Sequence, residues 1–546
     1  MDYYDLGTHS RKITTTSDQA QTWFDRGLVW TYAYNHEEAI KCFEQALAED
    51  ENCAMAHWGI AYAIGPNYNK PWEAFEDDEK PNALSIAQSA IRSCTALLDH
   101  VSDVERALIE AIQNRYPPQA DTETFAPWHD AYANAMRQVH HAHSKDLDIC
   151  TLFAEALMNR TPWQLWDLPS GSPMHGADTL EAVEVLETAF AEQTEAWDHP
   201  GLLHMYIHLM EMSPHPERAL RHGDRLYRLV PDAGHLVHMP THIDVLCGDY
   251  QNVVDRNQTA IEADQKFLDC AGADNFYTVY RCHNLHFKIY GAMFLGQPEP
   301  ALEAADALVN GLPRALLKQM ADWFEAFVPM KQHVLIRFGR WQDILAQELP
   351  QDGELYCVTT AMMRYAQTVA LANIKQLPAA EAEAALFQEA VARVPNTRML
   401  FNNTCQDILK VAEQMMLGEL EYHKGNAETA YDHLRRSVQI DDAMPFDEPW
   451  AWMQPTRHAL GALLLDGGHY HEAETVYRAD LGLDETLSRA CQHLANVWSL
   501  HGLHECLSRR GEEAEALIIK QQLKKAVARA GVPIRASCYC RNARTT

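Results

Sequence analysis

Histidine is the residue type whose number and spacing stand out in this sequence. The chain has 28 histidines among 546 residues. His204 and His208 form one pair, and His238 and His242 repeat its spacing at an offset of 34 residues. Because imidazole nitrogens bind Zn, Cu, Fe and Ni, and side chains four residues apart share one face of a helix, we interpret these blocks as part of a transition-metal site.

A third block completes the predicted ligand set. His283 and His286 lie three residues apart in the next segment of the chain. The predicted metal ligands are therefore His204, His208, His238, His242, His283 and His286. Six imidazoles exceed the needs of one tetrahedral ion, which leaves two alternatives: two ions, or one ion with further histidines that orient its ligands. His235 and His458 are open as additional members.

Glu211 and Tyr290 are the predicted catalytic residues. Glu211 follows His208 by three residues and would share its helix face. Its carboxylate has three open roles, as a metal ligand, as a general base, or as the hydrogen-bond partner of a ligating histidine. Tyr290 follows His286 by four residues and, with Tyr206, Tyr277 and Tyr280, is expected to shape the pocket.

Helices must position these side chains. Apolar residues recur at i, i+3, i+4 and i+7 almost throughout, and no segment alternates convincingly as a strand. In residues 23–50 the spacing matches the 34-residue tetratricopeptide pattern, through Trp23, Gly27, Ala39, Phe43 and Ala46. The small residues of this pattern let two helices of a hairpin cross closely.

Further hairpins repeat the distance of twelve residues between the two small positions. The first small position of each pair is Gly418, Gly461 or Gly502. We therefore predict an all-α, tetratricopeptide-like solenoid of helical hairpins, strongly curved or closed, with the histidines on the concave face of its first helices. Pro240 interrupts the second histidine block, because proline breaks or begins a helix.

The predicted organisation is a single superhelix over residues 1–546. Its parts are N-terminal repeats in 1–160, the histidine-rich repeats in 177–310, C-terminal repeats in 311–530 and a frayed tail in 531–546, with long ordered loops at 66–82, 160–176 and 440–456. The thirteen cysteines are scattered, and their close pair, Cys538 and Cys540, lies in that tail. Neither a disulfide framework nor a thiolate zinc site is predicted.

Charge and composition exclude several classes of function. Lys and Arg number 45 against 76 Asp and Glu, a net charge of −31, which disfavours nucleic acid and anionic membranes as partners. No apolar run is long enough for a membrane span or a signal peptide, so we expect a cytoplasmic protein. The motifs GxxxxGK[ST], GxGxxG after a strand, GxSxG and HExxH are all absent.

The histidine blocks also carry a resemblance. HMYIHLMEMSPHPE, GHLVHMPTHI and HNLHF resemble blocks of a family of large tetratricopeptide-repeat proteins, and the similarity extends to GLVWTYAYNHEEAIKCFEQAL and HALGALLLDGGHYHEAETVYRADL. The resemblance implies the repeat fold and marks the characteristic polar positions His204, His208, Glu211, His238, His242, His283 and His286. It implies no particular activity.

These observations lead to one expected function and two alternatives. We expect a metalloenzyme whose groove holds a histidine-ligated centre that oxidises a small organic substrate, with copper favoured and iron or zinc possible. The first alternative is a non-catalytic scaffold that binds a peptide or protein partner through the groove. The second is a zinc-dependent hydrolase.

Overall fold

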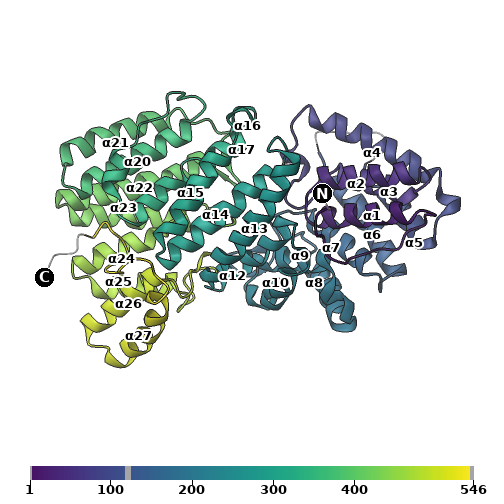
Figure 1. The fold of residues 1–546 in the computed structure, drawn as a ribbon. Helices are drawn as coiled ribbons and strands as arrows, with labels where there is room; N and C mark the ends of the chain where they lie inside the picture. The colour runs from purple at the N-terminus through teal and green to yellow at the C-terminus, as the bar shows by residue number, and fades with distance from the viewer. Residues whose placement is uncertain (1–2, 117–123, 542–546) are drawn as a thin grey trace. The chain divides into compact units, whose positions relative to one another are not determined.

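The structure, a computed structural model, describes residues 3–116 and 124–541, and helices dominate it (Figure 1). Contacts divide the chain into two units. Unit 1 comprises Met1–Ile243 and Glu262–Tyr277, and unit 2 comprises Asp244–Ile261 and Thr278–Thr546. The division falls inside the histidine-rich segment 177–310, so that the first two histidine blocks belong to unit 1 and the third belongs to unit 2.

The helices of unit 1 precede the division. They are α1 (Asp18–Tyr32), α2 (His36–Glu49), α3 (Ala54–Ala63), α4 (Glu79–Thr95), α5 (Asp103–Ile112), α6 (Ala126–Ala142), α7 (Leu147–Met158), α8 (Thr179–Glu192), α9 (Pro200–Glu211), α10 (Leu220–Leu226) and α11 (Gly234–His238). Two helices carry residues of both units, α12 (Pro240–Leu246) and α13 (Tyr250–Ala271).

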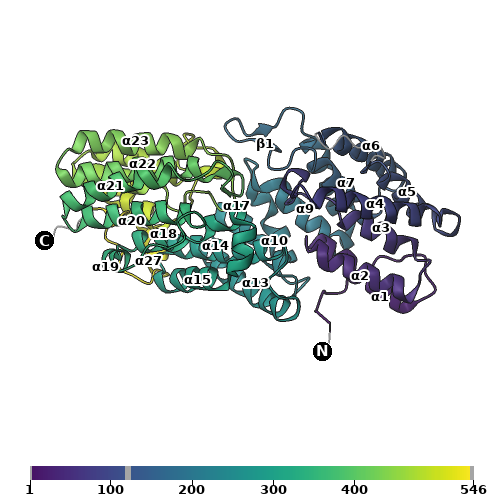
Figure 2. The ribbon, with the colours of Figure 1, turned by 90° about the horizontal axis from the view of Figure 1, so that it is seen from above.

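Unit 2 continues with helices to the C-terminal region. They are α14 (Thr278–Leu295), α15 (Pro298–Gly311), α16 (Arg314–Gln319), α17 (Ala321–Phe324), α18 (Met330–Arg337), α19 (Trp341–Leu345), α20 (Cys357–Asn373), α21 (Leu377–Val391), α22 (Cys405–Lys424), α23 (Ala427–Asp442), α24 (Thr456–Asp466), α25 (Tyr470–Asp480), α26 (Val497–Arg510) and α27 (Glu513–Val527). Consecutive helices pair as hairpins, for example α20 with α21 and α22 with α23 (Figure 2).

The predicted small positions are the points of close helix crossing. A Cβ on Gly27 of α1 would lie 2.5 Å from the ring of Phe43 on α2, and one on Gly461 of α24 would lie 2.5 Å from the ring of Tyr477 on α25. Gly418 of α22 has the same relation to Leu434 of α23, at 2.6 Å. The all-α prediction of tetratricopeptide-like helical hairpins is confirmed.

Strands occur only as two short ribbons among the described residues. β1 (Trp166–Asp167) pairs antiparallel with β2 (Ser172–Pro173), and β3 (Met399–Leu400) pairs antiparallel with β4 (Asn403–Thr404). The first ribbon lies inside the predicted loop 160–176. The prediction missed both ribbons because two-residue strands are too short to show alternation.

The predicted frayed tail is wrong for residues 531–541, while residues 542–546 lie outside the described part of the chain. Ser537 and Cys540 are buried, and the backbone N–H of Gly531 donates to the carbonyl of Gly296 at 2.9 Å. Cys538 and Cys540 are joined by a disulfide, which the sequence analysis did not predict. Contacts with residues far away in the sequence hold this segment, so local composition gave no sign of it.

None of the described helices combines the length and the apolar character that a membrane span needs.

Candidate metal centre

Helix α9 places two of the predicted ligands in unit 1. Its N-terminus is fixed by His199, whose Nδ1 accepts the backbone N–H of Leu202 at 3.1 Å, and by Pro200 in the first helical position. His204 and His208 lie one turn apart on this helix, so their rings share a face, with centroids 4.7 Å apart. Both side chains are fully buried.

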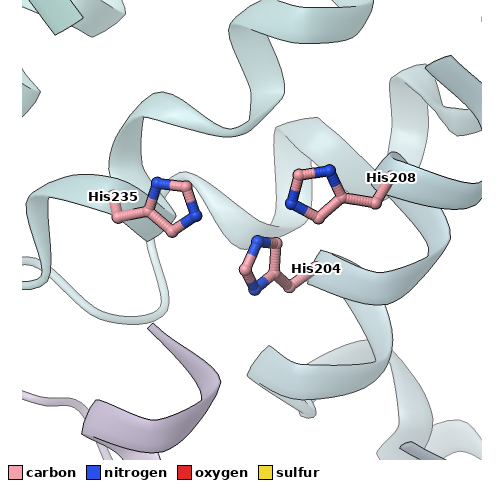
Figure 3. Close-up of side chains that lie close together, drawn as sticks. All are labelled: His204, His208 and His235. Carbon is pink, nitrogen blue, oxygen red and sulfur yellow. The ribbon is translucent and has the colours of Figure 1, made fainter. Parts of the chain in front are cut away.

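Helix α11 brings a third histidine to these two. The helix ends at His238, and Pro240 begins α12, so the predicted interruption at this proline is present. Within α11, the ring centroid of His235 lies 4.9 Å from that of His204. Figure 3 shows the rings of His204, His208 and His235 directed toward a common space. One ring nitrogen from each of these three residues, the histidine triad, lies within 4.8 Å of the others.

Hydrogen bonds determine which nitrogen His204 and His208 direct at this space. Nδ1 of His204 donates to the carbonyl oxygen of Tyr32 at 2.7 Å, and Nδ1 of His208 donates to Oε1 of Glu211 at 2.9 Å. In the neutral rings, Nε2 then carries the lone pair. Among the described residues, Nε2 of each of these two histidines is buried and has no hydrogen-bond partner. Such nitrogens are suited to a metal ion.

Glu211 binds a second imidazole through its other oxygen. Oε2 accepts a hydrogen bond from Nδ1 of His242 at 2.7 Å. Nε2 of His242 in turn lies 2.8 Å from Nε2 of His238. The carboxylate therefore connects α9 with α12, and it orients His208 as an outer carboxylate orients a metal-binding histidine. This is the hydrogen-bonding role among the three considered; its roles as ligand or base stay predictions.

Burial keeps the triad histidines of α9 neutral. It lowers the pKa of His204 to about 3, although the hydrogen bond to the carbonyl of Tyr32 acts in the opposite direction. Burial also lowers the pKa of His208 well below its ordinary value, and the neighbouring His204, His242 and His238 add to this effect. Since a metal ion competes with protons for imidazole, a ring that is neutral at pH 7 can bind a metal ion without first losing a proton.

Tyr34 separates the triad from a cavity of about 70 Å³ in unit 1, which has room for about two water-sized groups. Its ring centroid lies 4.6 Å from that of His204 and 5.6 Å from that of His235. The backbone of Tyr34 has φ of 54°, a left-handed conformation that costs energy for a bulky residue. The turn between α1 and α2 therefore holds this ring against the triad.

The cavity wall combines aromatic rings with charged groups. Lys70 places its Nζ 4.2 Å from the ring centroid of Phe75 and 4.5 Å from that of Phe276, and it forms an ion pair with Glu79. Tyr277 connects the wall to the triad, because its hydroxyl accepts the backbone N–H of His235 at 3.0 Å. The lining suits a small organic molecule that has both polar and apolar parts.

The other predicted residues lie in unit 2. His283 and His286 are buried on α14, and Nε2 of His286 lies 2.9 Å from Sδ of Met453. Tyr290 donates a hydrogen bond from its hydroxyl to Nε2 of His493 at 3.0 Å. His458, left open as a ligand, is hydrogen-bonded to Asp480 at 3.0 Å and to Arg337 at 2.8 Å. The six predicted ligands are thus divided, four in unit 1 and two in unit 2.

Sequence reasoning did not assign three residues of this site. His235 was left open because its membership depends on where the helix breaks before Pro240, although its place in the histidine stripe was a usable signal. Tyr34 gave no signal, since a tyrosine in a helical turn is ordinary. Asp148, which accepts a 2.6 Å hydrogen bond from the hydroxyl of Tyr32 and so supports the partner of His204, also gave none.

Comparisons with known proteins give no family for the chain. No family model and no curated protein matches it. Among solved structures, it is similar to the APC/C hetero-tetramer Cut9-Hcn1, with 12% identity over 93% of this chain and 76% of the other and a TM-score of 0.31. It is also similar to Naa15/Naa10 bound to HypK-THB, with 14% identity over 93% and 70% and a TM-score of 0.23. Likeness at this level assigns neither a partner nor an activity.

Proposed function

We propose that unit 1 binds a transition-metal ion through His204, His208 and His235. The observation that carries this proposal is the pair of buried Nε2 atoms on His204 and His208, which have no hydrogen-bond partner among the described residues and face the ring of His235. Leaving two polar atoms buried and unpaired costs free energy, about 1–3 kcal/mol each, and a bound cation removes that cost.

We further propose that the metal centre acts on a small organic substrate, as the centre of an oxidoreductase. Imidazole ligands without thiolates suit copper, and less well iron or zinc. The cavity beyond Tyr34 supports a small substrate, because Tyr34 both lines it and packs on His204, and because it has room for only a small group. A metal of this kind would supply a redox centre, and Glu211 would keep the imidazoles of His208 and His242 oriented by hydrogen bonds.

Metal analysis of the purified protein tests the proposal and separates it from the zinc hydrolase. The protein is purified without chelator, and its metals are counted by mass spectrometry. We expect at least one transition-metal ion per chain, with oxygen consumption on a suitable substrate if the metal is copper or iron. Zinc as the native metal, with hydrolytic activity, would support the alternative of a zinc-dependent hydrolase.

Substitutions locate the ion. His204→Ala, His208→Ala and His235→Ala are each expected to lower metal affinity at least tenfold, while His215→Ala, whose ring is 63% exposed, serves as the control. Affinity is measured by calorimetric titration of the metal-free protein. Stoichiometric, tightly bound metal in the His204→Ala/His208→Ala double variant would end the proposal.

His283 and His286 stay predicted ligands and need their own test. A ligating His286 requires that His286→Ala lower metal affinity about tenfold or more. If affinity is unchanged while His204→Ala abolishes binding, the centre consists of unit 1 residues alone.

A protein-binding scaffold is the second candidate function, and α27 favours it. Leu517 and Ile518 are adjacent on this helix and are 59% and 62% exposed. Two large apolar side chains exposed together supply contact area for a partner. We expect that replacing both residues by lysine abolishes co-purification of a partner protein. Leu180→Lys, at another exposed position, is the control and should keep the partner. A parent chain that co-purifies no protein would contradict this function.

A further inference from the structure

The C-terminal segment, residues 531–541, is held in place on unit 2. The guanidinium of Arg337 donates to the carbonyl oxygen of Ser537 at 2.6 Å, and the hydroxyl of Ser537 donates to the carbonyl oxygen of His458 at 2.8 Å. Ser537 is 1% exposed. These contacts join the segment to α18 and α24, so they fix the backbone that immediately precedes Cys538.

The segment is also held beyond the cysteines. Arg541 forms two parallel hydrogen bonds with the carboxylate of Glu505, at 2.7 and 2.9 Å, a geometry that fixes orientation as well as distance. The ring of Tyr539 packs on Gly339, where an added Cβ would lie 2.6 Å away. Cys538 and Cys540 are therefore positioned from both sides rather than free at a chain end.

A buried carboxylate lies beside the two sulfur atoms. Sγ of Cys538, Sγ of Cys540 and one carboxylate oxygen of Glu419 lie within 4.8 Å of one another. Glu419 on α22 is 1% exposed, and its Oε2 accepts a hydrogen bond from Asn373 at 3.2 Å. Among the described residues, its Oε1 is buried and has no hydrogen-bond partner. A buried carboxylate in this state is costly unless a cation compensates it.

The surroundings of Cys538 favour its metal-binding form. The backbone N–H of Cys540 points at Sγ of Cys538, at 3.1 Å, and such a donor stabilises a thiolate. Cys538 is partly exposed, so a reductant can reach the disulfide.

We propose that Cys538, Cys540 and Glu419 form a second metal site, of the zinc class, when the disulfide is reduced. Two thiolates and a carboxylate are ligands that Zn²⁺ takes in tetrahedral sites, and they leave one position for a further ligand. The site lies in unit 2 and shares no ligand with the histidine triad. It therefore stands independently of the function proposed for unit 1.

Occupation of this site requires one redox step and the release of two thiol protons. In the reduction, the S–S bond breaks, and each sulfur gains one electron and one proton from a thiol reductant, whose two sulfurs join in a disulfide. On metal binding, both cysteine thiols release their protons to solvent and Glu419 binds as the carboxylate. Oxidation of the pair reverses the step and expels the metal, so occupancy follows the redox state of Cys538 and Cys540.

Co²⁺ is the probe for this site, because a thiolate ligand gives it an intense near-ultraviolet charge-transfer band that imidazole ligands do not give. The full-length protein is reduced with a trialkylphosphine, which takes the oxygen of water as its oxide while the two protons go to the sulfurs. Titration with Co²⁺ without oxygen is expected to produce this band, with one additional Co²⁺ per chain relative to the oxidised protein. Zn²⁺ should displace it.

Variants assign the ligands. Cys538→Ser/Cys540→Ser is expected to lose the band and one equivalent of Co²⁺, whereas Cys270→Ser, which removes an exposed thiol of unit 1, should behave as the parent chain. Glu419→Gln keeps both cysteines and is expected to keep the band but weaken Co²⁺ binding at least tenfold. The His204→Ala/His208→Ala variant should retain the band, so a failure of the unit 1 proposal is distinguishable from a failure here.

Three results would overturn the proposal. They are a reduced protein that binds no additional Co²⁺, a thiolate band that survives in the double cysteine variant, and a Glu419→Gln variant with the affinity of the parent chain. Should the cysteine substitutions unfold the segment, the Glu419→Gln titration still decides, because that variant retains Cys538, Cys540 and the contacts of Ser537 and Arg541.

Discussion

Oε2 of Glu211 lies 2.7 Å from Nδ1 of His242, a residue 31 positions later in the chain. The same carboxylate accepts a hydrogen bond from His208 through Oε1. One acidic side chain thus fixes the tautomers of two imidazoles on different helices, and Nε2 of His208 is left to face the triad. This relationship makes Glu211 the most informative residue to alter without removing any proposed ligand.

Glu211→Gln is expected to lower metal affinity about 10–100-fold, because an amide retains the shape of the side chain but cannot accept from both imidazoles as a carboxylate does. Calorimetric titration of the metal-free protein measures the change. Glu192→Gln, at an exposed position on α8, is the matched control and should bind as the parent chain does. Equal affinities for the two variants would contradict the orienting role.

Local pattern was sufficient to predict much of the fold. The hairpin of α1 and α2 follows from residues within one repeat, such as Gly27 and Phe43, whose contact spans 16 positions. His204 and His208 were predictable as a pair for the same reason, since one helix carries both. Features that depend on a single repeat unit can be read from spacing alone.

The parts that the sequence could not predict depend on tertiary contacts. Whether His235 or His238 joins His204 and His208 is decided by the helix break before Pro240, and the rotation at a break is set by packing rather than by spacing. The C-terminal segment was predicted to fray because its anchors are remote; Arg337 and Ser537 are separated by 200 positions. The division into two units depends likewise on contacts across the whole chain.

Tyr34 is expected to control access to the triad. Replacing it with alanine removes the ring that lies 4.6 Å from the ring of His204 and lines the cavity, so a chelator should extract the metal at least tenfold faster. The rate is measured by the absorbance of a colorimetric chelator after mixing. Tyr34→Phe keeps the ring and should lose metal at the parental rate. Equal rates in the alanine and phenylalanine variants would show that the Tyr34 ring does not block access of the chelator to the metal.

The crossing of α1 and α2 predicts the effect of a single methyl group. Gly27→Ala would place its Cβ 2.5 Å from the ring of Phe43, so we expect the variant to be destabilised by about 1–3 kcal/mol through overpacking. Denaturant unfolding followed by circular dichroism measures this loss. Gly353→Ala is the control, because its Cβ would meet no atom within 4 Å, and a Gly27→Ala variant as stable as this control would be incompatible with the crossing.

The buried His333 should make the stability of the protein depend on pH, and replacing this residue should remove its contribution. Burial lowers the pKa of this 2% exposed histidine to about 3, against about 6.5 in the unfolded chain. Between these values the unfolded state binds a proton that the folded state does not. The free energy of unfolding therefore falls as the pH falls from about 6.5, by about 1.4 kcal/mol per pH unit, and this residue adds no slope above about pH 6.5.

His333→Phe keeps a ring against Trp452 but removes the titrating group. Between about pH 6.5 and 5 its free energy of unfolding should therefore fall by about 2 kcal/mol less than that of the parent chain. Denaturant titrations across this range measure the two slopes, with exposed His215→Phe expected to follow the parent, and parallel slopes for His333→Phe and the parent chain would mean that the buried ring is already protonated in the folded state.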